Sequence, residues 1–165
     1  MISGDLFRRG MSRLAGAVCL ITTSDAGGYH GFTASSVCSV TDDPPTLLVC
    51  MNRNVRSRET LLASKVVGVN VLAGHQHELA NAFASASMTM EQRFAGGGWQ
   101  PGATGAPLLA GAAVSFDCRL SESAEVGTHS VLFCEIMQVA FGAVDETLLW
   151  LDRNYHRLPL RRVQI

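Results

Sequence analysis

The chain has 165 residues, a length typical of one domain, and we treat residues 1–165 as a single domain. A formal net charge of −1 at pH 7 excludes the strongly basic surface of a typical nucleic-acid-binding protein, so we expect no nucleic-acid partner. Only 16% of the residues are charged and 47% are hydrophobic, which indicates that apolar surface is also buried between subunits.

The cysteines and the apolar runs indicate the compartment. Five cysteines, an odd number, lie in apolar runs with no Cys-x-x-Cys pair, which argues against a disulfide framework and a zinc site. Asp5, Arg8 and Arg9 interrupt the N-terminal apolar residues, and no segment reaches about eighteen consecutive apolar residues. We therefore expect a cytoplasmic protein with buried cysteines, no signal peptide, no membrane span and no metal.

The N-terminal part predicts a helix followed by a β-hairpin. Apolar residues at helical spacing indicate an amphipathic helix over about residues 4–15. Residues 17–22 form an apolar strand, and residues 24–28 form a turn whose glycines supply positive φ. A second strand begins near Tyr29 and leads into the most informative stretch of the chain.

That stretch runs from Gly31 to Asn52 and combines hydroxyl groups, β propensity and a proline turn. Pro44 and Pro45 belong to a connection, because proline donates no ladder hydrogen bond, and residues 46–51 then form a buried strand. We interpret the stretch as two strands around a cofactor, the alternative being a Ser/Thr-rich turn without a ligand. Hydroxyls that can donate to phosphate or ribityl oxygens are those of Thr33, Ser35, Ser36 and Ser39.

The middle of the chain predicts three helical segments and a strand. Residues 53–63 fit a polar loop and a short helix, residues 66–71 a strand, and residues 76–86 a helix with one apolar face. Residues 91–94 form a helical turn that breaks into the glycine loop 96–98. This loop lacks Gly-x-Gly-x-x-Gly spacing and is not a dinucleotide-binding fingerprint.

Strands dominate the C-terminal part, at residues 112–121, 127–139 and 148–151. Residues 114–121 alternate strictly between apolar and polar side chains, the pattern of a half-buried antiparallel strand. Several consecutive strands and few helices predict a mainly β fold with flanking helices, closed into a small barrel that leaves no exposed edge.

Four stretches together resemble one family in the same order along the chain. They are residues 31–52, the segment around Phe83, residues 91–99 with Arg93 before Phe94, and Gly127-Thr128-His129 with residues 152–156. The family is that of the short-chain flavin reductases, the reductase components of two-component flavin monooxygenases. The resemblance covers nearly the whole chain.

The resemblance implies a fold, an activity and a set of partners. The fold is an FMN-binding split β-barrel of antiparallel strands in Greek-key order, and the protein is a homodimer with the flavin at the subunit interface. The activity is NAD(P)H-dependent flavin reduction, in which a hydride passes from the nicotinamide to flavin N5. FMN or FAD is the flavin, NADH or NADPH the donor, and a flavin-dependent monooxygenase the partner that receives reduced flavin.

The resemblance also implies the residues of the site. Two positions depart from the common pattern: Val55 and Thr128 stand where many members have Ser and Asp. The implied residues for nicotinamide binding are His129, Arg153 and Tyr155. The implied FMN-binding residues are Thr33, Ala34, Ser35, Ser36, Val37, Cys50, Met51, Asn52, Arg56, Ser57, Phe83 and Arg93.

Other functions and simpler roles stay open on the residues alone. A corrin reductase would use bound flavin to reduce cob(II)yrinate, and a flavin- or haem-binding module would bind without turnover. Phe83 also fits ordinary core packing, and a lone strand histidine such as His129 also fits a structural role. Arg56 and Arg93 also fit solvated arginines of a loop and a helix end.

Overall fold

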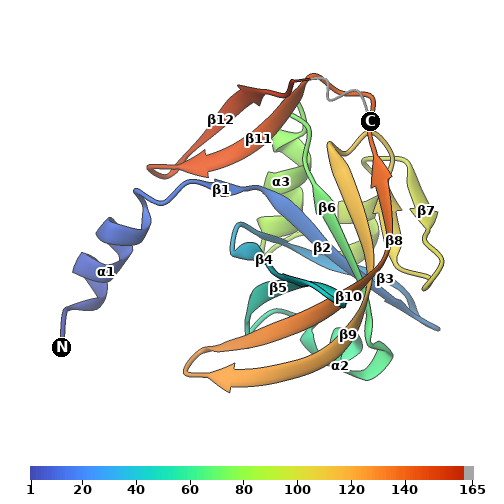
Figure 1. The fold of residues 1–165 in the computed structure, drawn as a ribbon, viewed down its shortest axis with the longest axis horizontal. Coiled ribbons are helices and arrows are strands. Elements are labelled where there is room, and N and C mark those ends of the chain that lie inside the picture. Colours follow the sequence, from blue (N-terminus) through green and yellow to red (C-terminus); the bar gives the residue numbers. More distant parts are fainter. Residues whose placement is uncertain (162–165) are drawn as a thin grey trace.

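The computed structural model describes residues 1–161, and Figure 1 shows a strongly curved antiparallel sheet with short helices around it. The helices are α1 (Gly4–Met11), α2 (Arg58–Ser64), α3 (His77–Ala84) and α4 (Met90–Phe94). Among residues 1–161, each helix is too short or too polar to span a lipid bilayer. The strands are β1 (Gly16–Ala17), β2 (Cys19–Asp25), β3 (Gly28–Ala34), β4 (Val37–Asp42), β5 (Pro45–Asn52), β6 (Val66–Val71), β7 (Trp99–Pro101), β8 (Pro107–Leu109), β9 (Val114–Val126), β10 (His129–Phe141), β11 (Glu146–Leu151) and β12 (Asn154–Pro159).

Seven strands form one sheet in the order β3-β2-β6-β9-β10-β5-β4. Its two edge strands, β3 and β4, are consecutive in the chain and are joined only by Ser35 and Ser36. The sheet must therefore curl until its edges meet, which makes a barrel with a seam between β3 and β4. We call this place, at Ser35 and Ser36, the seam. The predicted mainly β fold with flanking helices is confirmed.

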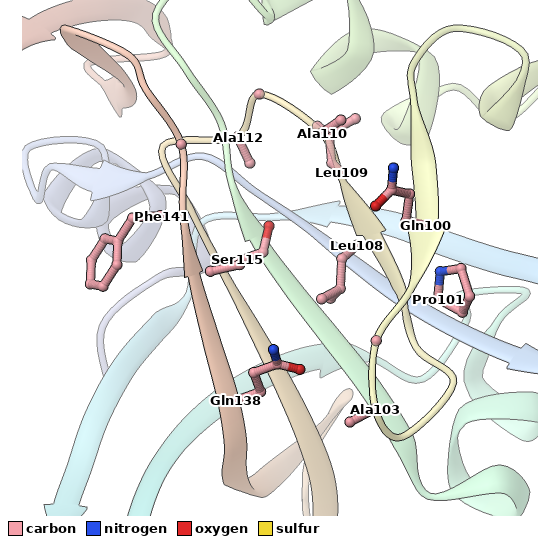
Figure 2. Close-up of a pocket in the computed structure, with 14 residues that line it drawn as sticks. Gln100, Pro101, Ala103, Leu108, Leu109, Ala110, Ala112, Ser115, Gln138 and Phe141 are labelled. Carbon is pink, nitrogen blue, oxygen red and sulfur yellow. The ribbon is translucent and has the colours of Figure 1, made fainter.

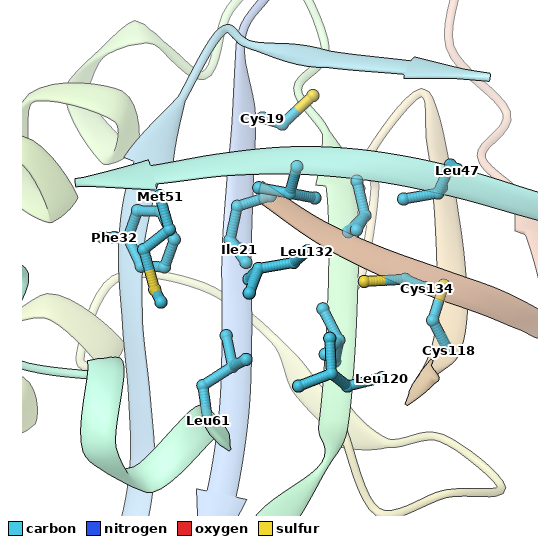
Figure 3. Close-up of a cluster of buried hydrophobic side chains, with 13 residues drawn as sticks. Cys19, Ile21, Phe32, Leu47, Met51, Leu61, Cys118, Leu120, Leu132 and Cys134 are labelled. Carbon is cyan, nitrogen blue, oxygen red and sulfur yellow. The ribbon is translucent and has the colours of Figure 1, made fainter. Parts of the chain in front are cut away.

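The barrel interior holds the larger of two hydrophobic cores (Figure 3). It collects inward-facing residues of the seven-stranded sheet, and α2 closes one end with Leu61. Burial raises the pKa of the Cys19 and Cys134 thiols to about 12, so both are inert apolar side chains. The expectation that all five cysteines are buried is wrong for two of them, since Cys38 is exposed and Cys50 is half-buried.

The second core lies outside the barrel, between the sheet and a layer made of α3, β8 and β11. Strand β2 serves both cores because successive side chains of a strand point to opposite faces. Cys19 and Ile21 face the interior, whereas Val18, just before the strand, and Leu20 face the outer layer. This double burial explains why β2 reads as a continuous apolar run and not as an alternating one.

Several boundaries differ from the predictions. The first helix ends at Met11 and not near residue 15, and Pro45 is the first residue of β5, paired with Asp42, and not part of the connection. A proline fits the first position of a strand because no ladder donor is needed there. Strands β7, β8 and β12 were not predicted.

A buried amide fastens the outer layer to the barrel. Asn70 on β6 is fully buried and its side chain makes five hydrogen bonds to three separate segments. Gly68 permits this packing, since a Cβ there would lie 2.9 Å from the Pro107 oxygen. The Asn70 amide donates to Leu20 O (3.2 Å), Thr22 Oγ1 (3.2 Å) and Pro107 O (3.3 Å), and accepts from Leu109 N (2.8 Å) and Ser115 Oγ (2.8 Å).

Replacing Asn70 should therefore destabilise the whole domain. Asn70→Ala leaves the Leu109 N–H buried without its acceptor, and we expect the free energy of unfolding in urea to fall by about 3 kcal/mol. Asn54→Ala is the control, because that exposed side chain has no hydrogen-bond partner within residues 1–161, and it should change the value by less than about 0.5 kcal/mol. A loss below about 1 kcal/mol for Asn70→Ala would contradict the role of this amide.

Candidate functional site

The seam brings the predicted cofactor stretch to one end of β5. Ser35 and Ser36 are exposed, and the Ser36 carbonyl accepts a hydrogen bond from Cys50 N at 3.0 Å. The Thr33 hydroxyl is already engaged, since it donates to the Ala80 carbonyl of α3 at 2.7 Å. Thr33 thus links the seam to α3, and the two serines keep their hydroxyls at the surface.

The loop between β5 and α2 lies at the same end. Asn52 is exposed, and its Oδ1 accepts the Asn54 N–H at 2.9 Å, which forms a tight turn. Ser57 immediately precedes α2 and is completely buried, but its hydroxyl has no hydrogen-bond partner within residues 1–161 and caps no helix N–H. A buried unpaired hydroxyl is uncommon and marks a place where a further polar group would be bound favourably.

Two guanidinium groups converge on the segment between α3 and α4. Arg93 is only 6% exposed, and its Nη1 donates to Gly31 O at 2.9 Å and to Phe83 O at 3.0 Å, while its Nη2 donates to Ser85 O. Arg56, which is exposed, donates to the carbonyls of Ala86 and Met88. Arg93 therefore braces the backbone beneath the site, whereas Arg56 lies at its surface.

The charge of this arginine pair is not compensated. No carboxylate within residues 1–161 lies within ion-pair distance of Arg56 or Arg93. Burial and then the nearby Arg56 lower the pKa of the Arg93 guanidinium, because both disfavour its charged form. The pair gives the site a positive potential that suits a phosphate.

His129 begins β10 and lies beside the end of β5. Its backbone pairs with Asn52 on one side and Val126 on the other, and its Nδ1 lies 2.9 Å from the Thr128 hydroxyl. Because side chains alternate along a strand, His129 and Asn52 share the outer face, opposite the buried Met51. The structure thus brings together a histidine and the end of the predicted flavin stretch.

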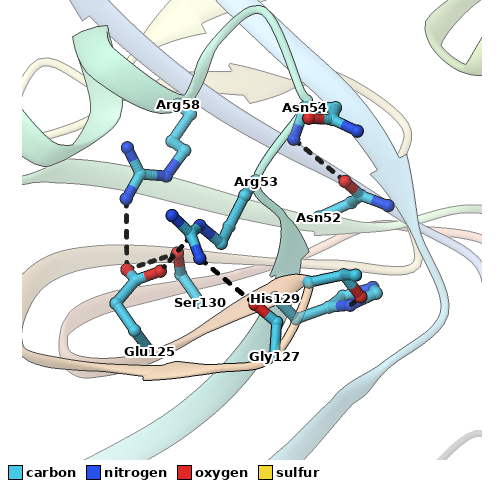
Figure 4. Close-up of polar contacts among 9 residues, drawn as sticks. Asn52, Arg53, Asn54, Arg58, Glu125, Gly127, His129 and Ser130 are labelled. Atoms are coloured by element: carbon cyan, nitrogen blue, oxygen red, sulfur yellow. Dashed lines mark hydrogen bonds and ion pairs between the residues drawn. The ribbon is translucent and has the colours of Figure 1, made fainter.

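A charged cluster that the sequence did not reveal ties β10, which begins at His129, to the loop between β5 and α2, which we call the flavin loop because it carries predicted flavin-binding residues (Figure 4). The Glu125 carboxylate accepts from Ser130 Oγ at 2.7 Å and Arg58 Nη2 at 3.1 Å, and lies 3.2 Å from Arg53 Nε. The Ser130 hydroxyl is the main cause that lowers the pKa of the Glu125 carboxyl, followed by Arg58 and Arg53. Glu125 therefore stays ionised at neutral pH.

The remaining predicted residues lie elsewhere in the chain. Arg153 has a φ of 61° at the turn between β11 and β12, and Figure 1 shows this hairpin tip well apart from the β9–β10 tip that precedes His129. The Tyr155 hydroxyl lies 2.9 Å from Asn81 Oδ1 of α3. Phe83 is 1% exposed and its ring packs against Phe94 with centroids 4.9 Å apart, as the core-packing alternative supposes.

A separate cavity of about 470 Å³ lies beside β8 of the outer layer (Figure 2). It is formed by β7, β8 and the end of β10, and none of the predicted site residues lines it. Gln100, Gln138 and Ser115 supply its polar groups, and the Ser115 hydroxyl is used by Asn70. We therefore place the candidate site at the seam and not in this cavity.

Comparisons with known proteins find flavin reductases among the proteins similar to this chain. FMN reductase (NADH) RutF from Ancylobacter novellus is 50% identical over 155 residues, which cover 94% of this chain and 85% of the relative. BorF, the flavin reductase component of a bacterial two-component tryptophan halogenase, matches with a TM-score of 0.89 and 30% identity, covering 96% of this chain and all of BorF. NADH:FAD oxidoreductase SgcE6 from Streptomyces globisporus, solved with NAD and FAD fragments, matches with a TM-score of 0.87 and 25% identity over 99% of both chains.

The family model described as the flavin reductase-like domain matches residues 11–159, which is most of the chain. This match includes the seam, the loop before α2, both arginines of the uncompensated pair and the β9–β10 hairpin with His129. The predicted family is confirmed, and the chain belongs to the flavin reductase-like domain family.

Proposed function

We propose that this protein is an NADH-dependent FMN reductase that supplies reduced flavin to a partner monooxygenase. The single observation that carries the proposal is the polar environment beside the seam. There, among the residues that the structure describes, the buried Ser57 hydroxyl has no partner and the Arg56–Arg93 pair has no counter-charge. The names of the similar proteins, an FMN reductase that uses NADH and a flavin reductase component of a two-component system, support the same activity.

The residues at the seam fit a flavin. Arg56 and the Ser57 hydroxyl would hold the phosphate, with Arg93 fixing the backbone beneath them. Ser35 and Ser36 would donate to the ribityl chain or the phosphate, and the end of β5 would face the isoalloxazine. Ala34, Val37, Cys50, Met51 and Asn52 supply backbone groups and surface around the same place.

The bound flavin supplies the redox chemistry, by accepting a hydride from the nicotinamide at N5. The protein needs no nucleophile or paired carboxylates for this reaction, and has to bind, orient and exclude water. His129 adjoins Asn52 and is half-buried, with Nδ1 engaged by Thr128, so that Nε2 is left to contact the nicotinamide nucleotide. We assign His129 to donor binding.

We also propose that the protein is a homodimer and that it is located in the cytoplasm. The outer face of the barrel supports the homodimer. Cys50, Leu48, Val131 and Phe133 of β5 and β10 share that face and are only half-buried in one chain. A second copy covering this apolar surface would enclose the flavin and bring the partner's hairpins, with Arg153 and Tyr155, toward the site.

An anaerobic experiment tests the proposed function directly. The purified protein is mixed with FMN and then with NADH or NADPH, and the flavin absorbance is followed. Bleaching with NADH faster than with NADPH is the expected result. FMN binding without bleaching by either nucleotide would overturn the reductase assignment and favour a binding module, and reduction of cob(II)yrinate by a tightly retained flavin would favour a corrin reductase.

Replacing the histidine should affect the donor more than the flavin. For His129→Ala we expect the KM for NADH to rise about tenfold, because a contact with the nucleotide is lost, while the dissociation constant for FMN stays within about twofold. His75→Ala is the matched control, since His75 is exposed and lies outside the site. Equal losses of NADH and FMN affinity in steady-state kinetics and FMN titration would remove His129 from the donor site.

Replacing the buried serine should separate binding from stability. Ser57→Ala should weaken FMN by roughly 1 to 3 kcal/mol, the usual loss for a hydrogen bond to a charged group. The free energy of unfolding of the protein without flavin should not fall, because the hydroxyl has no hydrogen-bond partner in residues 1–161 to lose. An unchanged FMN titration would exclude Ser57 from the site, and Ser121→Ala on exposed β9 serves as the control.

A further inference from the structure

We propose that Glu125 is a positioning residue for the donor side of the reaction, which holds the His129 strand in place against the flavin loop. The proposal rests on the proposed flavin reductase function and adds a residue that the sequence did not indicate. Glu125 lies near the end of β9, three positions before Thr128, at the base of the hairpin turn that carries His129.

The geometry of the carboxylate is that of a brace between three segments. Oε1 takes hydrogen bonds from Ser130 on β10 at 2.7 Å and from Arg58 on α2 at 3.1 Å, and Oε2 lies 3.2 Å from Arg53 Nε in the loop after β5. These residues are up to 72 positions apart in sequence, as from Arg53 to Glu125. Figure 4 shows Arg53, from the loop after β5, and Arg58, from the start of α2, both reaching toward Glu125.

The brace surrounds the proposed functional residues on both sides. Arg53 and Arg58 flank the segment with Arg56 and Ser57, while Ser130 directly follows His129. Arg53 adds two contacts to the turn itself, since its N–H donates to Thr128 O at 3.0 Å and its Nη1 donates to Gly127 O at 3.2 Å. Movement of the hairpin tip relative to the loop therefore requires breaking contacts made or oriented by Glu125.

The hairpin needs such a brace because little else fixes its tip. Residues 121–128 are exposed, and at the Gly127 turn, which has a φ of +57°, the hydrogen bonds from another segment come from Arg53, a member of the same network. The ladder sets the pairing of His129 with Asn52, but residues 121–126 of β9 pair only with β10 among the described residues, so this edge of the hairpin can still twist and move the histidine side chain. A charge-assisted network at the base of the turn restricts this motion.

The Glu125 carboxylate also affects which of the nearby arginines can bind a phosphate. Glu125 pairs with both Arg53 and Arg58, the two arginines that flank the proposed phosphate-binding segment, and Arg56 has no carboxylate partner among the described residues. Loss of the carboxylate would release Arg53 from the turn. Loss of the Glu125 carboxylate should therefore weaken binding of the nicotinamide nucleotide at His129 more than binding of FMN.

The test uses Glu125→Gln, which keeps the size of the side chain and an acceptor for Ser130 but removes the charge. We expect the KM for NADH to rise about five- to tenfold, with kcat and the FMN dissociation constant within about twofold, because the defect lies in placing the donor site. Glu122→Gln is the matched control, since it removes the same charge from an exposed position of β9. A double-mutant cycle with Arg53→Gln should be strongly non-additive, because both changes break one network.

A second readout separates this inference from the proposed function. Without flavin or NADH, hydrogen exchange of the backbone amides of residues 127–130 should be faster in Glu125→Gln than in the parent or in Glu122→Gln, and the His129 imidazole resonances should shift. Unchanged exchange and resonances would overturn the positioning role, as would equal rises in the KM for NADH and the FMN dissociation constant. Absence of NADH-dependent flavin reduction by the parent protein would overturn the proposed function alone, since the exchange measurement does not depend on it.

If Glu125→Gln does not fold, Arg53→Lys replaces it. The lysine keeps the charge near Glu125 but has no guanidinium to reach both the carboxylate and the Gly127 carbonyl. The same selective rise in the KM for NADH, of about three- to fivefold, supports the brace. An unchanged KM in Arg53→Lys together with unchanged hydrogen exchange of residues 127–130 contradicts it.

Discussion

The two-residue connection between β3 and β4 is the constraint on which the rest of the structure depends. These strands are the two edges of a seven-stranded sheet, and Ser35 and Ser36 alone join them. A sheet whose edges are tied in this way has to curl into a barrel, and the tie becomes its seam. Backbone groups at a seam are not all used by a ladder, so the place where the barrel closes is also where a ligand can hydrogen-bond with the main chain. Fold closure and the proposed flavin site thus depend on the same few residues.

The outer layer is needed because closing the barrel buries only one face of β2 and leaves apolar residues on its other face. Leu20 points away from the interior, so a second core must cover it, and α3, β8 and β11 do so. The fully buried Asn70 fastens this layer, and Arg93 fastens α3 to the seam through the carbonyls of Gly31 and Phe83. A buried guanidinium that donates to carbonyls is stabilised without a carboxylate, which is why its positive charge persists beneath the proposed phosphate site.

Elements with a clear local pattern or a family resemblance could be predicted from the sequence. Features that depend on how distant strands pair could not. The alternation of residues 114–121 and the helical spacing near Phe7 were sufficient to place β9 and α1. Strands β7 and β8 contain prolines and look like turns, and they exist because Asn70 and Gly68 hold them to the sheet. The turn before β12 has positive φ at Asp152 and Arg153 without any glycine, so no turn signal was present. The Glu125 network joins this carboxylate to Arg58, 67 positions away, and to Arg53, and only the paired strands bring them together.

The arginines near the seam illustrate how the fold assigns different roles to one residue type. Arg53 and Arg58 share the carboxylate of Glu125, and Arg93 is buried beneath the surface, so Arg56 is the exposed arginine of this group without a carboxylate partner among the described residues. Sequence alone shows several arginines on a polar loop and gives no basis for choosing among them. The fold distinguishes them, because β9 brings Glu125 against Arg53 and Arg58, and α4 buries Arg93. The proposed phosphate site is therefore defined as much by the carboxylate that pairs with the neighbouring arginines as by the exposed arginine that it leaves unpaired among the described residues.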